Sequence, residues 1–261
     1  IFGESMTKAY FGDDYYGEAA IKNQVQKAKF VQDKLHELGI ELLILFAPGK
    51  SSIYTEFLPE YLFKTPKKTC NSEMYVKQCT AQNVNFIDFI RLFSSLKTTT
   101  KYPLFSKYGS HWSYYSECIV IDTTVKRLET LMKVNLPNIK YSNIELKDTS
   151  LVRDADIFRK TQMKIPKGDL LAYPKSIGYE QGVGIKPEKV LGIGDSYFRG
   201  FFYLGAMKYA FDNAQQWYYY NSIIPENPNN PEVWELDLKT EILKHKAILI
   251  LCNEMNLENL G

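Results

Sequence analysis

The chain has 261 residues, a formal net charge of +2 and 24% charged residues, with both signs interspersed. This balance argues against a nucleic-acid-binding footprint and against a polybasic membrane-binding patch. No apolar run reaches the roughly 18 residues that a membrane-spanning helix needs.

Apolar periodicity predicts helices and strands that alternate along the chain. The expected N-terminal elements are a helix at 18–38, a strand at 40–47, helices at 55–63 and 72–82, a strand at 84–87, and helices at 88–96 and 113–134. The stretch 136–184 has weak periodicity and is interpreted as an insertion or lid. The expected C-terminal elements are a strand at 189–193, a helix at 197–209, a strand at 215–220, a Pro/Asn-rich loop at 224–231, a helix at 232–244 and a strand at 247–252. This alternation predicts a single α/β domain over residues 1–261, a three-layer α/β/α sandwich with a largely parallel sheet.

The segment Gly194-Asp195-Ser196 closes an apolar strand and precedes an amphipathic stretch. A serine on such a strand-to-helix turn lies at the carboxyl edge of the sheet, where α/β proteins place their sites. The free N–H groups of the following turn can stabilise an oxyanion, and the Ser196 N–H is one expected donor. Ser196 is therefore a candidate nucleophile, and Asp195 is expected to brace the turn through local hydrogen bonds.

The chain has three histidines, and we expect His36 and His245 to lie at the surface. His111 lies on a loop before the helix predicted at 113–134, with Ser113 as a plausible N-cap. A histidine on a loop rim is well placed to act as the base for Ser196. The alternative is a histidine that only caps or packs the start of the helix.

The four cysteines fall in two kinds of surroundings. Cys118 and Cys252 belong to apolar patterns and are expected to be buried and unpaired. Cys70 and Cys79 flank a polar-rich segment and could form a local disulfide in an oxidising compartment. No Cys-x-x-Cys pair and no cluster with metal-ligand spacing occurs, so we expect no metal and no cofactor.

The Gly194-Asp195-Ser196 block resembles the nucleophile block of SGNH (GDSL-like) hydrolases. In ordinary members the histidine follows the serine, whereas here His111-Trp112 precedes it. This order, with the segment Phe46-Ala47-Pro48-Gly49-Lys50-Ser51-Ser52-Ile53-Tyr54 ahead of it, resembles the alginate O-acetyltransferase group of the AlgX/AlgJ type. The similarity spans nearly the whole chain.

The resemblance implies an SGNH-like fold and O-acetyl transfer to an extracellular polysaccharide through a Ser196–His111 acyl-enzyme mechanism. The alternatives are a carbohydrate acetylesterase and a catalytically silent glycan-binding relative. The resemblance also implies a periplasmic or cell-surface setting and a membrane-bound O-acyltransferase partner that supplies acetyl groups. The chain begins at Ile1, so we expect that an upstream segment, such as an N-terminal signal or anchor, has been removed.

One departure from the family pattern concerns the acid of the triad. In the family's Asp-x-His-Trp block the aspartate orients the imidazole, but here Gly109 occupies its position. A carboxylate from another loop could replace it, with Glu254 as the first candidate and Asp88 as the weaker one, because both follow predicted strands. A backbone carbonyl or a water could orient His111 instead. The third explanation is a non-catalytic relative that binds glycans.

Four further residues are candidates for substrate binding. Lys50 could contact an anionic substrate, or it could be a solvated loop lysine. Arg199 could bind a carboxylated sugar, or it could form a surface ion pair. Trp112 and Tyr108 flank His111 and could line the acceptor groove, or Trp112 could simply pack. The aromatic run at 217–220 can stack on sugar rings, but a half-buried strand with polar tips is the favoured interpretation.

Overall fold

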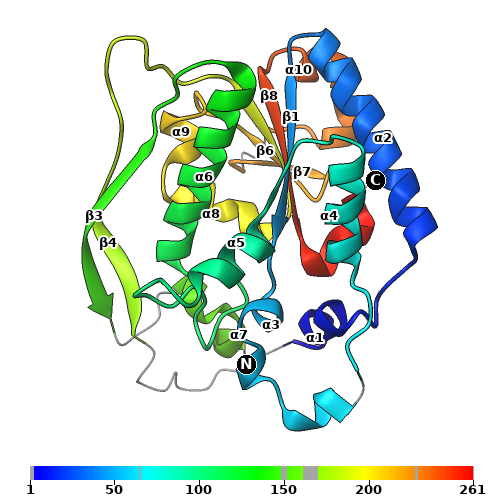
Figure 1. Cartoon of the computed structure of the whole chain (residues 1–261). Helices are drawn as coiled ribbons and strands as arrows, with labels where there is room; N and C mark the ends of the chain where they lie inside the picture. The colour runs from blue at the N-terminus through cyan, green and yellow to red at the C-terminus, as the bar shows by residue number, and fades with distance from the viewer. Residues whose placement is uncertain (1–2, 65, 148–151, 161–169, 227–228, 261) are drawn as a thin grey trace.

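The computed structural model describes residues 3–64, 66–147, 152–160, 170–226 and 229–260. The strands are β1 (Glu41–Ala47), β2 (Phe86–Asp88), β3 (Ile139–Lys147), β4 (Leu171–Tyr179), β5 (Val190–Gly194), β6 (Gln216–Tyr218), β7 (Ser222–Ile224) and β8 (Ala247–Asn253). Within these described ranges the main sheet has the order β2-β1-β8-β5-β6-β7, parallel except for the β6–β7 pair (Figure 1). Strands β3 and β4 form a separate antiparallel pair.

Helices cover both faces of the main sheet. The α-helices are α1 (Glu4–Phe11), α2 (Glu18–Glu37), α3 (Lys50–Ile53), α4 (Asn71–Ala81), α5 (Phe89–Leu96), α6 (Tyr114–Met132), α7 (Asp156–Lys160), α8 (Arg199–Tyr203), α9 (Ala206–Tyr209) and α10 (Leu238–Ile242). The 3-10 helices are η1 (Thr55–Phe57), η2 (Glu60–Lys64), η3 (Val152–Ala155), η4 (Ser196–Phe198), η5 (Val233–Glu235) and η6 (Glu254–Leu260). Figure 1 shows α2 and α4 on one side of the sheet and α5, α6 and α8 on the other.

The two faces follow from the alternation of side chains along a strand. In β1, Ile44 and Phe46 pack with α2 and α4, whereas Leu43 and Leu45 belong to the core that contains α5, α6 and α8. Both sets are fully buried. A parallel strand that is covered on both faces reads as a continuous apolar run, as this one does. The predicted α/β/α sandwich with a largely parallel sheet is confirmed.

Several predicted helices are shorter or divided. The helix expected at 55–63 is two 3-10 helices, because Pro59 between them cannot donate a helical hydrogen bond. The helix expected at 197–209 consists of η4, α8 and α9, with Gly205 in the left-handed region between the last two. The helix expected at 232–244 consists of η5 and α10. Periodicity alone does not detect these breaks.

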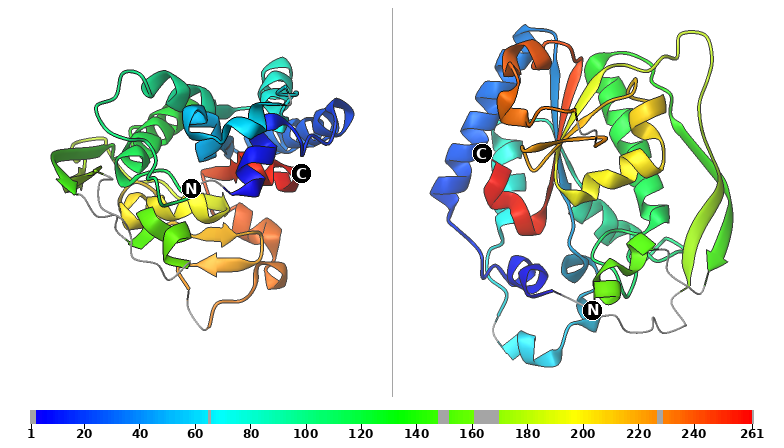
Figure 2. Two further views of the ribbon diagram at one scale, coloured as in Figure 1. Left: turned by 90° about the horizontal axis from the view of Figure 1, so that it is seen from below. Right: turned by 180° about the vertical axis from the view of Figure 1, so that it is seen from behind.

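The stretch 136–184 contains the β3–β4 pair, which packs against the outer side of α6 (Figures 1 and 2). Tyr115 and Tyr114 of α6 contact Tyr141 of β3 and Tyr173 of β4, respectively. The chain between these strands carries η3 and α7, and Figure 1 places α7 below the carboxyl ends of β1 and β8. The chain between β3 and β4 therefore places η3 and α7 at the edge of the sheet where Ser196 lies.

The expected disulfide between Cys70 and Cys79 is wrong, because all four cysteines are free and buried. Cys70 is the N-cap of α4 and Cys79 lies in its last turn, so about two and a half helical turns separate them. That separation is well beyond disulfide geometry. Cys118 and Cys252 are buried and unpaired, as expected. In the described ranges no helix is both long and apolar enough to span a bilayer.

Candidate active site

Ser196 begins η4 directly after β5, on a turn that hydrogen bonds hold from within. The buried Asp195 accepts from the backbone N–H of Tyr197 at 2.9 Å and from that of Asn253 at 3.0 Å. Gly194 has no room for a side chain, since a Cβ there would lie 2.3 Å from the carbonyl oxygen of Leu251. Asp195 therefore braces the elbow and ties it to the neighbouring strand β8.

The His111 imidazole meets the Ser196 hydroxyl. The Nε2 atom of His111 lies 2.8 Å from Ser196 Oγ. The imidazole packs on the ring of Tyr197 at a centroid distance of 4.7 Å, and the Tyr197 hydroxyl donates to the backbone carbonyl of Ser110 at 2.6 Å. Tyr197 thus fixes both the ring and the loop that carries it, within reach of the serine proton.

Asp156 of α7 orients the imidazole. Its Oδ2 lies 3.0 Å from His111 Nδ1, and its Oδ1 accepts from the Ser110 backbone N–H at 2.8 Å. The Ser110 hydroxyl donates to Oδ2 at 2.5 Å. Burial alone would raise the pKa of Asp156, but the hydrogen bonds from His111 and Ser110 hold it at about 2. The ionised carboxylate keeps the proton of His111 on Nδ1, which leaves Nε2 free to accept from Ser196.

The absence of a side chain at Gly109 leaves room for the segment that carries Asp156. A Cβ at position 109 would lie 2.7 Å from the backbone oxygen of Asp154 and 3.0 Å from Asp156 Oδ1. The end of η3 and the start of α7 therefore occupy the space that a side chain at 109 would fill. The carboxylate that the family pattern places at 109 is supplied here from the chain between β3 and β4.

The two acids expected to orient His111 lie elsewhere, so that expectation needs correction. Glu254 is buried and turns toward α3, where it accepts from the Gly49 backbone N–H at 2.8 Å and from the Ser52 hydroxyl at 2.7 Å. Asp88 caps α5 by accepting from the backbone N–H of Arg91. It ends the edge strand β2, three strand spacings or roughly 14 Å from β5.

The buried carboxyl of Glu254 makes folding stability depend on pH. Burial raises its pKa from 4.5 to about 7, although hydrogen bonds from Ser52 and Gly49 favour the ionised form. A carboxyl whose pKa is higher in the folded chain binds protons more tightly there, so stability falls as pH rises from about 4.5 to about 7. Glu254→Gln keeps an acceptor without the charge. We expect it to raise the free energy of unfolding at pH 8 by up to about 3 kcal/mol, and the gain to vanish near pH 4. Urea unfolding of both proteins at the two pH values measures this, and a gain independent of pH would contradict it.

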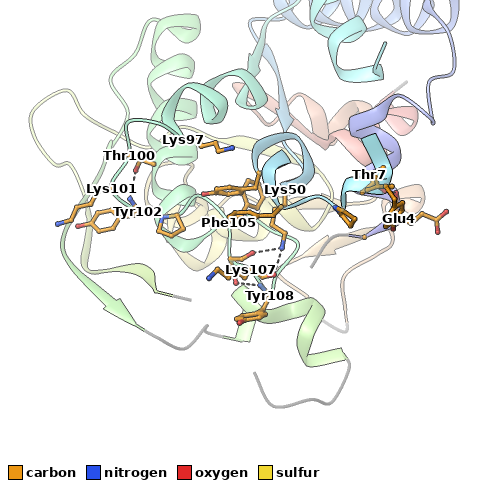
Figure 3. A pocket seen from close by; sticks show the side chains of 18 residues that line it. Glu4, Thr7, Lys50, Lys97, Thr100, Lys101, Tyr102, Phe105, Lys107 and Tyr108 are labelled. Carbon is orange, nitrogen blue, oxygen red and sulfur yellow. Dashed lines mark hydrogen bonds between the residues drawn. The ribbon is translucent and has the colours of Figure 1, made fainter. Parts of the chain in front are cut away.

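Lys50 is a buried support of the histidine loop, which corrects the expectation that it contacts substrate. Its ammonium donates to the backbone carbonyls of Ser106 at 3.0 Å, Lys107 at 3.1 Å and Gly109 at 2.7 Å. Figure 3 shows this side chain pointing into the loop at 106–109. The cation thereby ties α3 to the residues that precede His111.

A family model described as "SGNH hydrolase-like domain, acetyltransferase AlgX" matches residues 7–147, more than half of the chain. The chain belongs to this AlgX family. The matched segment includes Lys50 and His111 and ends before Asp156 and Ser196. The assignment of the last two residues to the site therefore rests on the geometry above. No curated protein sequence matches significantly.

Solved structures share the fold of this AlgX-family chain. The O-acetyltransferase domain of Pseudomonas putida AlgJ is 13% identical with a TM-score of 0.56, over 90% of this chain and 82% of that one. Pseudomonas aeruginosa AlgX is 12% identical with a TM-score of 0.55, over 91% of this chain and 59% of that one. Bacillus cereus PatB1 is 9% identical with a TM-score of 0.57, over 94% and 93%. The chain thus spans less than two thirds of the AlgX structure, and at these identities the likeness concerns the fold.

The remaining predicted contact residues have different surroundings. Trp112 is 1% exposed and packs against Phe89, Phe93 and Tyr197, so it belongs to the core and cannot line a groove. Arg199 is exposed one turn after Ser196, with its guanidinium 5.3 Å from the centroid of the Tyr218 ring. A cation over an aromatic face at this distance is a favourable pair. Of the four contact candidates, only Arg199 lies on the helix that follows Ser196, and its side chain is exposed.

Tyr108 and Lys50 line a cavity of about 1070 Å³ beside α3 (Figure 3). Other aromatic and basic residues of its wall are Tyr54, Phe57, Tyr61, Tyr102, Phe105, Lys97, Lys101 and Lys107. In the described part of the chain, the wall includes none of Ser196, His111 and Asp156. The Tyr108 ring also packs on Phe158 of α7 at 5.2 Å. The cavity therefore borders the histidine loop without including Ser196.

The turn that joins β6 to β7 also lies close to Ser196, because the Tyr219 backbone N–H donates to the carbonyl of Gly194 at 3.0 Å. Its central residues, Tyr219 and Tyr220, have φ of 49° and 58°, and the Asn221 N–H donates to the Tyr218 carbonyl at 3.0 Å. This is a type I′ turn, which favours Asn-Gly. A left-handed conformation costs a residue with a Cβ about 1–2 kcal/mol. The expected strand at 215–220 therefore ends at Tyr218, before the turn.

Proposed function

We propose that this chain is an O-acetyltransferase that acetylates hydroxyl groups of an extracellular polysaccharide through an acetyl-enzyme on Ser196. The observation that carries the proposal is the continuous hydrogen-bond chain from Ser196 through His111 to Asp156. A nucleophile, a base and an acid in this order form an acyl-transfer site. Membership of a family described by an acetyltransferase supports acetyl as the group transferred.

The reaction has two halves. In the first, His111 Nε2 accepts the Ser196 proton as Oγ attacks the carbonyl carbon of an acetyl donor. The imidazolium, stabilised by Asp156, then returns that proton to the departing oxygen or sulfur of the donor. In the second half a sugar hydroxyl attacks the acetyl-enzyme and gives its proton to His111. The proton passes to Ser196 Oγ as the ester bond to the serine breaks.

The backbone supplies part of the oxyanion stabilisation. The Ser196 N–H is the first of the turn η4, and N–H groups in a first turn have no partner within the helix. In our proposal it donates to the acetyl oxygen as that oxygen becomes negative. The Asn253 side chain is committed elsewhere, since its amide donates to the backbone carbonyls of Ala47 and Pro48. We therefore assign the first oxyanion contact to the Ser196 backbone.

The setting and the acetyl source form part of the same proposal. The resemblance to AlgX/AlgJ-type proteins favours an extracytoplasmic location, at the cell surface or in the periplasm. There, a membrane-bound O-acyltransferase partner would supply acetyl groups, and a carbohydrate polymer would accept them. A carbohydrate acetylesterase would share the acetyl-enzyme and use water in place of the sugar hydroxyl. The catalytically silent, glycan-binding alternative was based on the missing acid at position 109. It is less favoured because Asp156 hydrogen-bonds to His111 in place of that acid.

Acceptor dependence separates a transferase from an esterase. With an activated acetyl ester as donor, we expect oligosaccharide to increase the rate of donor consumption and to appear as acetylated sugar by mass spectrometry. Water attacks the acetyl-enzyme slowly, whereas a bound hydroxyl is already positioned. Ser196→Ala is the control for uncatalysed transfer. Acetate release at one rate with and without any acceptor would favour the esterase.

A further inference from the structure

We propose that the tyrosine turn, defined as Tyr218–Asn221, is the platform on which the acceptor saccharide lies during deacetylation of Ser196. The rings of Tyr219 and Tyr220 would stack on pyranose faces, and the Tyr219 hydroxyl would contact the sugar beside its reacting hydroxyl. This inference rests on the proposed function and adds to it the location of the acceptor.

Backbone strain is the first observation behind the proposal. Among the described residues, the other left-handed positions outside glycine are asparagines or aspartates, except Lys133 at the end of α6. Asparagine and aspartate tolerate this conformation, but tyrosine does not favour it. Strained residues persist where the surroundings fix them, and they cluster at functional sites. Two consecutive tyrosines in such a turn thus need an explanation beyond hairpin formation.

Packing explains these two residues only in part. Tyr219 is 47% exposed and Tyr220 is 42% exposed, although burial raises the pKa of the Tyr220 phenol, which interacts with Cys252 and Asp195. The fold gains less from half-exposed rings than from buried ones. Asn-Gly would form the same turn without the strain. Exposed tyrosine rings with a hydroxyl at the tip are, however, suited to sugars, which present apolar ring faces and polar edges.

The turn is fixed against the nucleophile elbow. The Tyr219 backbone N–H donates to the carbonyl of Gly194 at 3.0 Å. Burial raises the pKa of the Tyr219 phenol, and the nearby Ser196 side chain lowers it in part. The phenol therefore stays protonated at neutral pH. A sugar stacked on this ring would hold a hydroxyl close to an acetyl group on Ser196.

Neighbouring groups extend the platform. The Tyr219 ring meets the Tyr218 ring edge to face at 4.6 Å, and Arg199 lies over Tyr218. On the other side, the backbone N–H of Val233 donates to the Asn221 carbonyl at 2.7 Å, and the next residue, Trp234, is 67% exposed. The tyrosine turn thus has an exposed cation on one side and a segment with an exposed aromatic residue on the other.

The test replaces the two tyrosines with the residues that this turn favours, Tyr219→Asn and Tyr220→Gly together. Binding of a mannuronate hexamer and of an N-acetylglucosamine hexamer is measured by calorimetry in the Ser196→Ala background. The hexamer that the Ser196→Ala protein binds is the one compared. We expect its Kd to be at least about tenfold higher when the two tyrosines are also replaced. In the Ser196 protein, hydrolysis of an activated acetyl ester without acceptor is measured in parallel, to separate loss of acceptor binding from loss of the serine chemistry. The melting temperature should not fall, because strain is relieved.

Two further variants separate strain from recognition. Lys133→Gly relieves a left-handed residue far from the site and should leave hexamer binding unchanged. Tyr219→Phe keeps the ring and removes the hydroxyl. It should raise the KM for the acceptor, because the ring remains but the contact of its hydroxyl with the sugar is lost.

The outcomes distinguish this inference from the proposed function. Hexamer binding that is unchanged in the double variant would overturn the platform alone. A melting temperature lowered by more than about 5 °C would also overturn it, by showing that the rings serve the fold. Ester hydrolysis lost in parallel with binding would place Tyr219 in the serine chemistry instead. A wild-type protein that forms the acetyl-enzyme but binds neither hexamer would contradict both the platform and the polysaccharide acceptor.

Discussion

Replacing Asp156 with asparagine is expected to lower kcat/KM for an activated acetyl ester by about 10³–10⁴, as for the acid of a triad protease. The carboxylate accepts from His111 Nδ1 and so keeps Nε2 as an acceptor for Ser196. An asparagine amide can donate to Nδ1 instead. The proton then moves to Nε2, and the base can no longer take the serine proton. Ester hydrolysis over pH 5–9 measures the loss.

The controls for this prediction are Glu254→Gln and Asp88→Asn, which change the two acids that the sequence favoured. Both should keep kcat/KM within about threefold, because neither carboxyl contacts His111. Circular dichroism of all three variants shows whether each is folded. If Glu254→Gln loses as much activity as Asp156→Asn in a folded protein, the assignment of Asp156 as orienting acid is wrong.

Restoring the aspartate of the family pattern at position 109 is expected to inactivate the protein. The new Cβ would lie 2.7 Å from the Asp154 carbonyl oxygen, and the new carboxylate would face that of Asp156. Displacement of α7 would pull Asp156 from His111. We expect Gly109→Asp to lose at least about 100-fold in kcat/KM and about 1–3 kcal/mol in the free energy of unfolding. Ester hydrolysis and urea unfolding measure the two losses.

Gly109→Ala isolates the steric part of this effect and should destabilise without adding charge. Combining Gly109→Asp with Asp156→Ala should not rescue activity, because the clash with the Asp154 backbone remains. A double variant as active as the wild type would show that a carboxylate at 109 fits, contrary to the steric account.

The layered fold could be predicted from the sequence because its signals are local. The run Leu42–Ala47 reads as a strand covered on both faces, and Ser113 caps α6 as expected by accepting from the Ser116 N–H. The breaks were harder to predict where they depend on one residue, as at Pro59 and Gly205. The β3–β4 pair could not be predicted from periodicity, because its strands carry polar side chains outward and pack mainly against α6, with Tyr179 of β4 also contacting Tyr209 of α9.

The site could be predicted only where a residue's role follows from its own segment. Ser196 lies on a recognisable turn, and His111 precedes a capped helix, so the two could be paired from the sequence. Asp156 follows no predicted strand and lies in the stretch of weak periodicity. Its position depends on the tertiary path of the chain between β3 and β4. The glycine at position 109, where the family pattern has an aspartate, was the one signal that an acid from elsewhere in the chain was needed. The role of Lys50 could not be predicted, because no local pattern shows that its ammonium donates to three backbone carbonyls.

The central claim is that Ser196 carries an acetyl group during the reaction. Its most direct test is peptide-resolved mass spectrometry of the protein quenched in acid within seconds of mixing with an activated acetyl ester. The account predicts one acetyl group on the peptide that contains Ser196, absent in Ser196→Ala and strongly reduced in His111→Ala. Two results would contradict this claim. One is wild-type protein without an acetyl group on this peptide, and the other is acetylation of other residues only, to the same extent in the wild type and in Ser196→Ala.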